Sequence, residues 1–126
     1  MGKHSVRLAG LDAPEQGQAA TTWDGRQVDQ GDIAKRVLIN KLRGQWVEVE
    51  VWKRDHYGRL VGTVWVGDRD INKELVREGV AYACYGETYR HDQAQARSER
   101  RGMWRNRAMT HPVQWRRNAL LRKRID

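Results

Sequence analysis

The feature that most constrains the fold is a pair of apolar segments separated by a short turn. In "QWVEVEVW" the valines from Val47 to Val51 alternate with glutamates, which is the period of a strand with one buried face. "RDHYGR" follows as a turn with Gly58, and "RLVGTVWV", residues 59–66, is a second apolar run. The sequence therefore predicts a β-hairpin over residues 45–66, around which the rest of the chain must pack.

Helical periodicity precedes this hairpin in "DIAKRVLINKLR", residues 32–43. Four apolar side chains share one face of the predicted helix: Ile33, Val37, Leu38 and Leu42. We expect Asp32 to cap its start and Gly44 to end it, because these residue types favour those positions.

Two more helices are predicted after the hairpin. "DINKELVREG" indicates a short helix capped by Asp70 or Asn72 and ended by Gly79, with Leu75 and Val76 facing inward. "TYRHDQAQARSERRG" predicts a polar helix that stops at its final glycine.

The two ends of the chain and one long connection are less regular. "VRLAGL", residues 6–11, is apolar and followed by Pro14, which predicts a strand. Residues 15–31 are polar and predict a long mobile loop. After Pro112, "VQWRRNALLRKR" is compatible with either a basic helix or a frayed tail.

Charge is distributed very unevenly along this chain of 126 residues, a length that indicates one domain. Residues 1–96 carry 14 Lys/Arg and 14 Asp/Glu, whereas residues 97–126 carry 10 Lys/Arg and only 2 Asp/Glu. The whole net charge of +8 therefore lies in the last quarter. Such a block indicates either a surface that binds phosphates or a solvated helix face, and charge alone favours neither.

Several protein classes are excluded by composition. A single cysteine, Cys84, rules out an intramolecular disulfide framework, and no apolar run of 18 residues indicates a membrane span. The four histidines are scattered without CxxC or HExxH spacing, so no zinc site is expected. The first residues contain no secretory apolar segment, which leaves the compartment unassigned and cytoplasmic by default.

Arg7, Asp12 and Glu15 lie close together in "VRLAGLDAPE", where the predicted strand ends. Asp12 could give an oxygen to a hard cation, Glu15 could take a proton from water, and Arg7 could pair with a phosphate. These three roles together would suit a phosphodiester site. On local pattern alone, an ordinary strand-to-loop turn with surface charges is the favoured interpretation.

Aromatic and basic side chains recur at two later positions. Arg59 in the predicted turn could contact a second phosphate oxygen, while Tyr57 and Tyr85 offer rings on which a base could stack. A hairpin turn and ordinary packing explain the same residues without any ligand.

Taken in order, six segments of the chain resemble the staphylococcal nuclease-like (thermonuclease) family: "VRLAGLDAPE", "GDIA", "VEVEVWKRDHYGRLVGTVWV", "DINKELVREGVAYACY", "RRGMW" and "PVQWRR". The resemblance implies an α+β fold, a five-stranded OB-type β-barrel packed by helices. It also implies a calcium-dependent phosphodiesterase, or nuclease, that acts on DNA and RNA.

The resemblance assigns roles to individual positions. Arg7 and Arg59 match the family's two catalytic arginines, and Glu15 matches its presumed general base. Asp12 matches a calcium ligand, and the carbonyl of Ala13 also faces the metal in the family. Tyr57 and Tyr85 match tyrosines that flank the nucleotide.

The sequence departs from the family at its start. Members carry a β-hairpin before the "VRL" strand, with a further calcium-binding aspartate, whereas only residues 1–5 precede Val6 here. We therefore expect a barrel without its first two strands over residues 1–111, a basic tail over residues 112–126 and a weak calcium site.

An incomplete barrel leaves sheet edges and an apolar face open, so it should pair with a second copy as a dimer or recruit its own tail. Three tail residues could serve the second purpose: Trp115, Leu120 and Leu121. Three functions stay open at this point: a nuclease, a non-catalytic nucleic-acid-binding module and a truncated remnant that survives by self-association.

Overall fold

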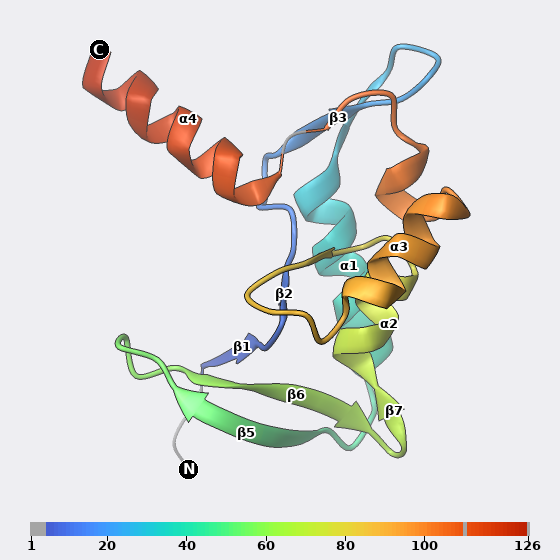
Figure 1. The fold of residues 1–126 in the computed structure, drawn as a ribbon, viewed down its shortest axis with the longest axis vertical. Helices are drawn as coiled ribbons and strands as arrows, with labels where there is room; N and C mark the ends of the chain where they lie inside the picture. Colours follow the sequence, from blue (N-terminus) through green and yellow to red (C-terminus); the bar gives the residue numbers. More distant parts are fainter. Residues whose placement is uncertain (1–4, 110, 126) are drawn as a thin grey trace.

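The structure is a computed structural model that describes residues 5–109 and 111–125, with residues 119–125 described as backbone alone. The strands are β1 (Val6–Leu8), β2 (Leu11–Asp12), β3 (Ala19–Thr21), β4 (Gln27–Asp29), β5 (Glu48–Arg54), β6 (Leu60–Val66), β7 (Arg69–Asp70) and β8 (Tyr82–Ala83). The helices are α1 (Gln30–Leu42), α2 (Ile71–Arg77), α3 (Arg90–Ser98) and α4 (Pro112–Ile125), with a 3-10 turn at Gly102–Arg105. Strands and helices are mixed along the chain, which confirms the α+β class (Figure 1).

The predicted hairpin forms the larger sheet. β5 and β6 pair antiparallel, with a register shift between Val51 and Lys53, and β1 pairs in parallel with the other edge of β6. β7 adds a short antiparallel pair to the end of β6. The described strands run in the order β1-β6-β5, so β1 and β5 are outer strands and no pairing between them closes the sheet.

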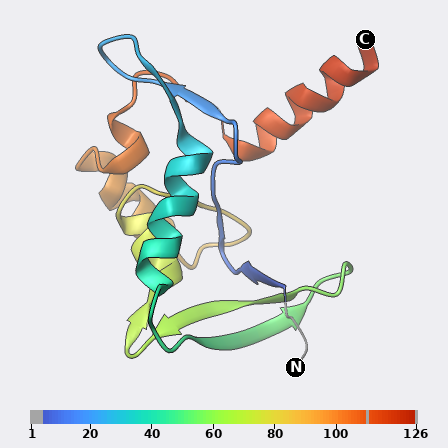
Figure 2. The same cartoon turned by 180° about the vertical axis from the view of Figure 1, so that it is seen from behind.

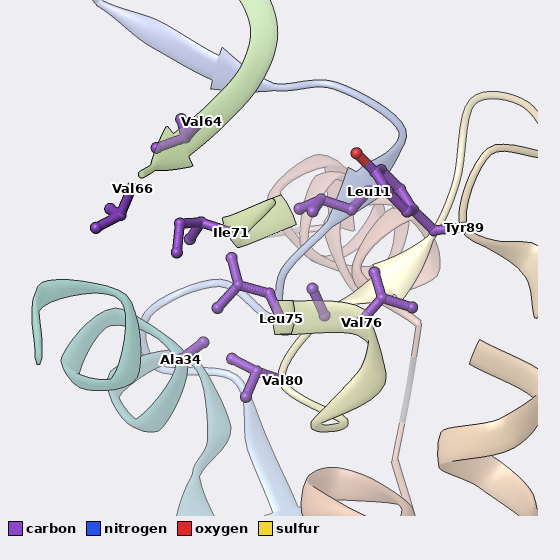
Figure 3. Packing of buried hydrophobic residues seen from close by; sticks show 10 residues of the cluster. Leu11, Ala34, Val64, Val66, Ile71, Leu75, Val76, Val80 and Tyr89 are labelled. Atoms are coloured by element: carbon purple, nitrogen blue, oxygen red, sulfur yellow. The ribbon is translucent and has the colours of Figure 1, made fainter. Parts of the chain in front are cut away.

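The hydrophobic core lies between α2 and this sheet. Ile71, Leu75 and Val76 of α2 are at most 3% exposed and belong to one cluster with Val64 and Val66 of β6. In Figure 3 Ile71 lies beside Val66, while Val76 lies on the side of Leu11 and Tyr89. Five other buried residues complete the cluster: Leu11, Ala34, Val80, Ala81 and Tyr89. Leu75 and Val76 therefore face inward as predicted.

The ends of α2 are as the sequence predicts. The Asp70 side chain accepts a hydrogen bond from the backbone N–H of Lys73 and caps the helix start. Gly79 follows the last turn with φ of +73°, a conformation that glycine adopts without strain.

Asn72 of α2 holds β1 and β6 together. Its side chain is fully buried, and its Nδ2 donates to the carbonyl oxygens of Ala9, at 3.0 Å, and of Gly62, at 3.1 Å. Its Oδ1 accepts a hydrogen bond of 3.0 Å from the backbone N–H of Val64. One amide thus serves three backbone groups from the segments that lead into the candidate site.

Replacing this amide should destabilise the protein strongly. Asn72→Ala would remove the side-chain partner of the Val64 N–H and of the Ala9 carbonyl, while the Gly62 carbonyl would keep its hydrogen bond from the Ala9 N–H. We expect a loss of about 3 kcal/mol in the free energy of unfolding. Urea unfolding of the variant measures it, with Asn40→Ala on the exposed face of α1 as the matched control. An unchanged urea midpoint for Asn72→Ala would contradict this account of Asn72.

α1 begins earlier than predicted, and its cap is wrong by three residues. Asp29 is the N-cap, and its Oδ1 accepts a hydrogen bond of 2.9 Å from the backbone N–H of Asp32. Ile33 is exposed, but Val37, Leu38 and Leu42 pack against the core beside the buried Ala34, so three of the four predicted residues face inward. The start of α1 also packs closely against the rest of the protein, because a Cβ on Gly31 would lie 1.8 Å from the Glu15 carbonyl oxygen.

The prediction of a long loop over residues 15–31 is wrong. β3 and β4 form an antiparallel hairpin there, with Gly25 in the turn at φ of +85°. Thr21 also forms a bridge with Ala108. The predicted strand over residues 6–11 is likewise divided, because Gly10 has φ of +77° between β1 and β2.

The predicted half-buried face of β5 is only partly covered. Val49 packs partly against the core, but Val51 is 51% exposed and Trp46, just before the strand, is 94% exposed. β5 is an outer strand, so both its edge and part of its apolar face are open among the described residues.

The basic C-terminal segment is helical from Pro112 onward. Figures 1 and 2 show that α4 extends outward at the opposite end of the molecule from β5 and β6, so it does not lie along the sheet. The side chains of Leu120 and Leu121, expected to cover the sheet, lie outside the described residues. Among the described residues, none of the helices has the length and apolar content needed to cross a bilayer.

Candidate functional site

β1 and β2 place the first group of predicted site residues. Arg7 in β1 is paired with Val61 of β6, and Asp12 in β2 is paired with Tyr82 of β8. Gly10 makes the bend between them, where a Cβ would lie 3.0 Å from the ring of Tyr89. Each side chain is therefore fixed by its own strand pairing, and the bend brings the two together.

Asp12 and Glu15 both bind the guanidinium group of Arg116 from α4. The Arg116 Nη2 lies 2.8 Å from Asp12 Oδ2, and its Nη1 lies 2.5 Å from Glu15 Oε1. Hydrogen bonds to Asp12 and then to Glu15 raise the pKa of Arg116, so it stays charged. The two acids thus form a cation-binding pair, with one side-chain nitrogen on each carboxylate.

Tyr85 connects this acid pair to Arg7. The Tyr85 hydroxyl donates a hydrogen bond of 3.3 Å to Asp12 Oδ2, and the Arg7 guanidinium lies 4.3 Å from the centre of the Tyr85 ring. Burial, and next the charge of Asp12, raise the pKa of Tyr85, so its hydroxyl keeps its proton at neutral pH.

A small pocket opens beside Arg7 and Tyr85. Its volume is about 160 Å³, and Trp52 and Lys53 of β5 are also among its lining residues. Two cationic side chains and aromatic walls in one pocket suit an anionic group attached to a flat ring.

Arg59 and Tyr57 stand apart from the acid pair. The Arg59 Nε donates to Asp55 Oδ2 at 2.8 Å, and its guanidinium lies 5.3 Å from the centre of the Tyr57 ring. Asp55 also accepts hydrogen bonds from the backbone N–H groups of Tyr57 and Arg59. The hydrogen bond and the ring contact described for the Arg59 side chain are therefore both within its own hairpin.

Of the six predicted site residues, the structure thus gathers four around one place: Arg7, Asp12, Glu15 and Tyr85. Arg116 joins them, although no role was predicted for it. It lies in the basic C-terminal block and in "PVQWRR", one of the segments that resemble the family, but nothing local shows which arginine reaches back more than a hundred residues.

The oxygen atoms of this site fit a hard cation, although few protein ligands are present. Within the described part of the chain, no group of three or more His, Cys, Asp or Glu side chains could hold a metal ion. The carboxylates of Asp12 and Glu15 are suitable oxygen donors and already bind a guanidinium, but Ca²⁺ takes about six to eight oxygens. Water would have to supply most of the remaining ligands.

Three other aspartates near this region are engaged elsewhere. Asp29 caps α1 and accepts a hydrogen bond from the backbone N–H of Gly17, while Asp24 pairs with Arg26. Asp32 pairs with Arg36 one turn along the same helix. None of these acids joins Asp12 and Glu15 in the described structure.

Comparison with known proteins identifies the family of the chain. The model of the family described as staphylococcal nuclease homologues matches residues 5–106, which contain all six predicted site residues. The chain therefore belongs to the staphylococcal nuclease homologue family. Arg116 lies outside the matched residues.

Individual relatives carry related names. A probable endonuclease of Vanderwaltozyma polyspora is 31% identical over 124 residues, covering 87% of this chain and 43% of that protein. A probable staphylococcal-like nuclease of Oryza sativa subsp. japonica is 29% identical, over 92% of this chain and 33% of its own length. An uncharacterized endonuclease of Escherichia coli O157:H7 is 31% identical, over 88% of this chain and 69% of its length. The chain thus spans less than half the length of the first two relatives.

Proposed function

We propose that the chain is a nuclease that hydrolyses phosphodiester bonds of DNA or RNA with the help of calcium. The observation that carries this proposal is the convergence of Arg7, Tyr85, Asp12 and Glu15 on one place, where the two acids hold the guanidinium of Arg116. Relatives named endonuclease support the same reaction class. In this proposal residues 1–111 form the catalytic domain and residues 112–126 a basic appendage.

The proposed chemistry uses the site residues in distinct roles. Glu15 accepts a proton from water as the water oxygen forms a bond to phosphorus. The bond from phosphorus to the leaving ester oxygen breaks, and that oxygen takes a proton from solvent. Arg7 donates hydrogen bonds to the non-bridging oxygens, where negative charge develops in the transition state.

Arg59 and the two tyrosines complete the proposed site. Arg59 reaches the phosphate only if its side chain leaves Asp55, while Tyr85 already lies at the pocket and offers its ring to the adjacent sugar or base. Tyr57, 74% exposed on the hairpin, offers a second ring. Asp12 with the carbonyl of Ala13 and water would hold a calcium ion, whose charge would offset that of the phosphate.

A cleavage assay tests this proposal directly. The purified chain is incubated with single-stranded DNA and with RNA of the same sequence, in calcium or in excess chelator. We expect shortened products in calcium and none in chelator. Intact substrate under both conditions would overturn the proposal.

One observation favours a second candidate, a non-catalytic module that binds nucleic acid. Arg116 occupies both acids, and the basic block of residues 97–126 provides positive charge for phosphates. Binding that weakens steeply with salt, without any cleavage in calcium, would select this function.

We also propose that the chain self-associates as a dimer through β5. This strand has an open edge in the described sheet, and Val51 and Trp52 on it are each about half exposed. Open apolar edge strands pair readily with other strands. Sedimentation at micromolar concentration should show a dimer that Val51→Lys shifts towards monomer, and a monomeric wild-type chain would contradict the proposal.

A further inference from the structure

We infer that Arg116 and a divalent cation compete for the carboxylate of Asp12, so that cation binding releases the start of α4 from the site. The inference rests on the proposed function, which places the cation on Asp12, one of the two carboxylates that Arg116 holds. It adds a built-in competitor that the family-matched residues 5–106 do not contain.

The contact geometry makes the two cations alternatives. Arg116 places one nitrogen 2.8 Å from Asp12 Oδ2 and another 2.5 Å from Glu15 Oε1. Calcium binds carboxylate oxygens at about 2.3–2.6 Å, so a calcium ion on Asp12 would occupy the space that the Arg116 Nη2 fills. A guanidinium and a calcium ion there would also repel each other. Asp12 therefore holds one or the other, and release of Arg116 also frees Glu15.

Arg116 is the principal polar attachment of α4 to the rest of the described structure. Pro112 at the helix start is buried, and the other side-chain hydrogen bonds described for this helix are local, such as Gln114 with Asn118. The remainder of α4 extends outward in both views (Figures 1 and 2). When the ion pairs of Arg116 are lost, the described side chains that still attach the start of α4 are the buried Pro112 and the half-buried Val113 and Trp115.

Linkage then requires a reciprocal effect. If docking of Arg116 lowers the binding constant for calcium by some factor, bound calcium lowers the equilibrium constant for docking of the helix by the same factor. Couplings of this kind are typically about five- to 150-fold.

Calcium titration of three full-length proteins tests the competition without any nucleic acid. Calorimetry should show that Arg116→Gln binds Ca²⁺ about five- to 150-fold more tightly than the wild type. Arg117→Gln is the matched control: it removes the same charge from the next position of α4, which is exposed and makes no ion pair among the described residues. It should bind Ca²⁺ like the wild type.

Hydrogen exchange gives a second readout. Backbone amides of residues 113–118 should exchange faster in wild type when calcium is added, while in Arg116→Gln they should exchange fast with and without calcium. Equal calcium affinity in all three proteins, weaker binding by Arg116→Gln, no calcium binding by any of them, or unchanged exchange at α4 would each overturn the inference. Circular dichroism confirms that each variant is folded.

The outcome is separable from that of the cleavage assay. Competition for calcium without nuclease activity would refute only the proposed reaction. Calcium-dependent cleavage with the same calcium affinity in wild type and Arg116→Gln would refute only the role of Arg116.

Discussion

Glu15→Gln is expected to lower the cleavage rate in saturating calcium by about 10²- to 10⁴-fold, the usual contribution of a positioned general base. Glutamine has nearly the same shape as glutamate, but it cannot take a proton from water. The rate is measured at high substrate concentration on the substrate that wild type cleaves best, so that a change in binding does not mask a change in chemistry.

The matched control for this variant is Glu87→Gln. Glu87 is exposed before α3, and its ion pair in the described part of the chain is with Arg90 nearby, so its loss should leave the rate unchanged. If Glu15→Gln cleaves as fast as this control, Glu15 is not the base. If both variants and wild type are equally slow, the activity does not come from this site.

Local signals predicted α2 well because all its determinants lie within ten residues. Asp70 caps it, Leu75 and Val76 face the core, and Gly79 ends it, as the spacing indicated. The hairpin of β5 and β6 was predicted for the same reason, from alternation around the turn at Gly58.

The errors fall where distant contacts decide the structure. β3 contains only Ala19, Ala20 and Thr21, which show no strand periodicity, and Thr21 bridges to Ala108 far along the chain. Val51 fits the alternating pattern of a half-buried strand, yet half of its surface is exposed because no described element covers that part of β5. The sequence pattern shows which face of a strand is apolar, but it does not show which other element of the protein covers that face.

The candidate site shows the same division. Asp12 and Glu15 were singled out from a short motif, since chain geometry over four residues keeps them near each other. Their partner Arg116 depends on where α4 begins and on its direction, neither of which a local pattern specifies. The position of the Arg59 side chain, by contrast, is decided locally. It forms an ion pair with Asp55, four residues earlier in the chain.

Arg7→Lys is expected to reduce the maximal cleavage rate by about 10²- to 10³-fold, comparable to the loss of one preorganised donor to transition-state charge. Lysine keeps the positive charge, so long-range attraction of nucleic acid should change little. It loses the planar fork that can bind two phosphate oxygens and also rest on the Tyr85 ring, 4.3 Å away in wild type. The loss should therefore appear in the maximal rate more than in the Michaelis constant.

Arg54→Lys is the control for Arg7→Lys, because Arg54 at the end of β5 is exposed and its side-chain hydrogen bond among the described residues is to the Gly58 carbonyl of the same hairpin. It should retain the wild-type rate. Equal rates for Arg7→Lys and this control would mean that charge alone matters at Arg7. In that case Arg7, which lies near Tyr85 and Asp12, would contribute to binding of the nucleic-acid strand and not to the chemical step. Another cationic group would then stabilise the transition state.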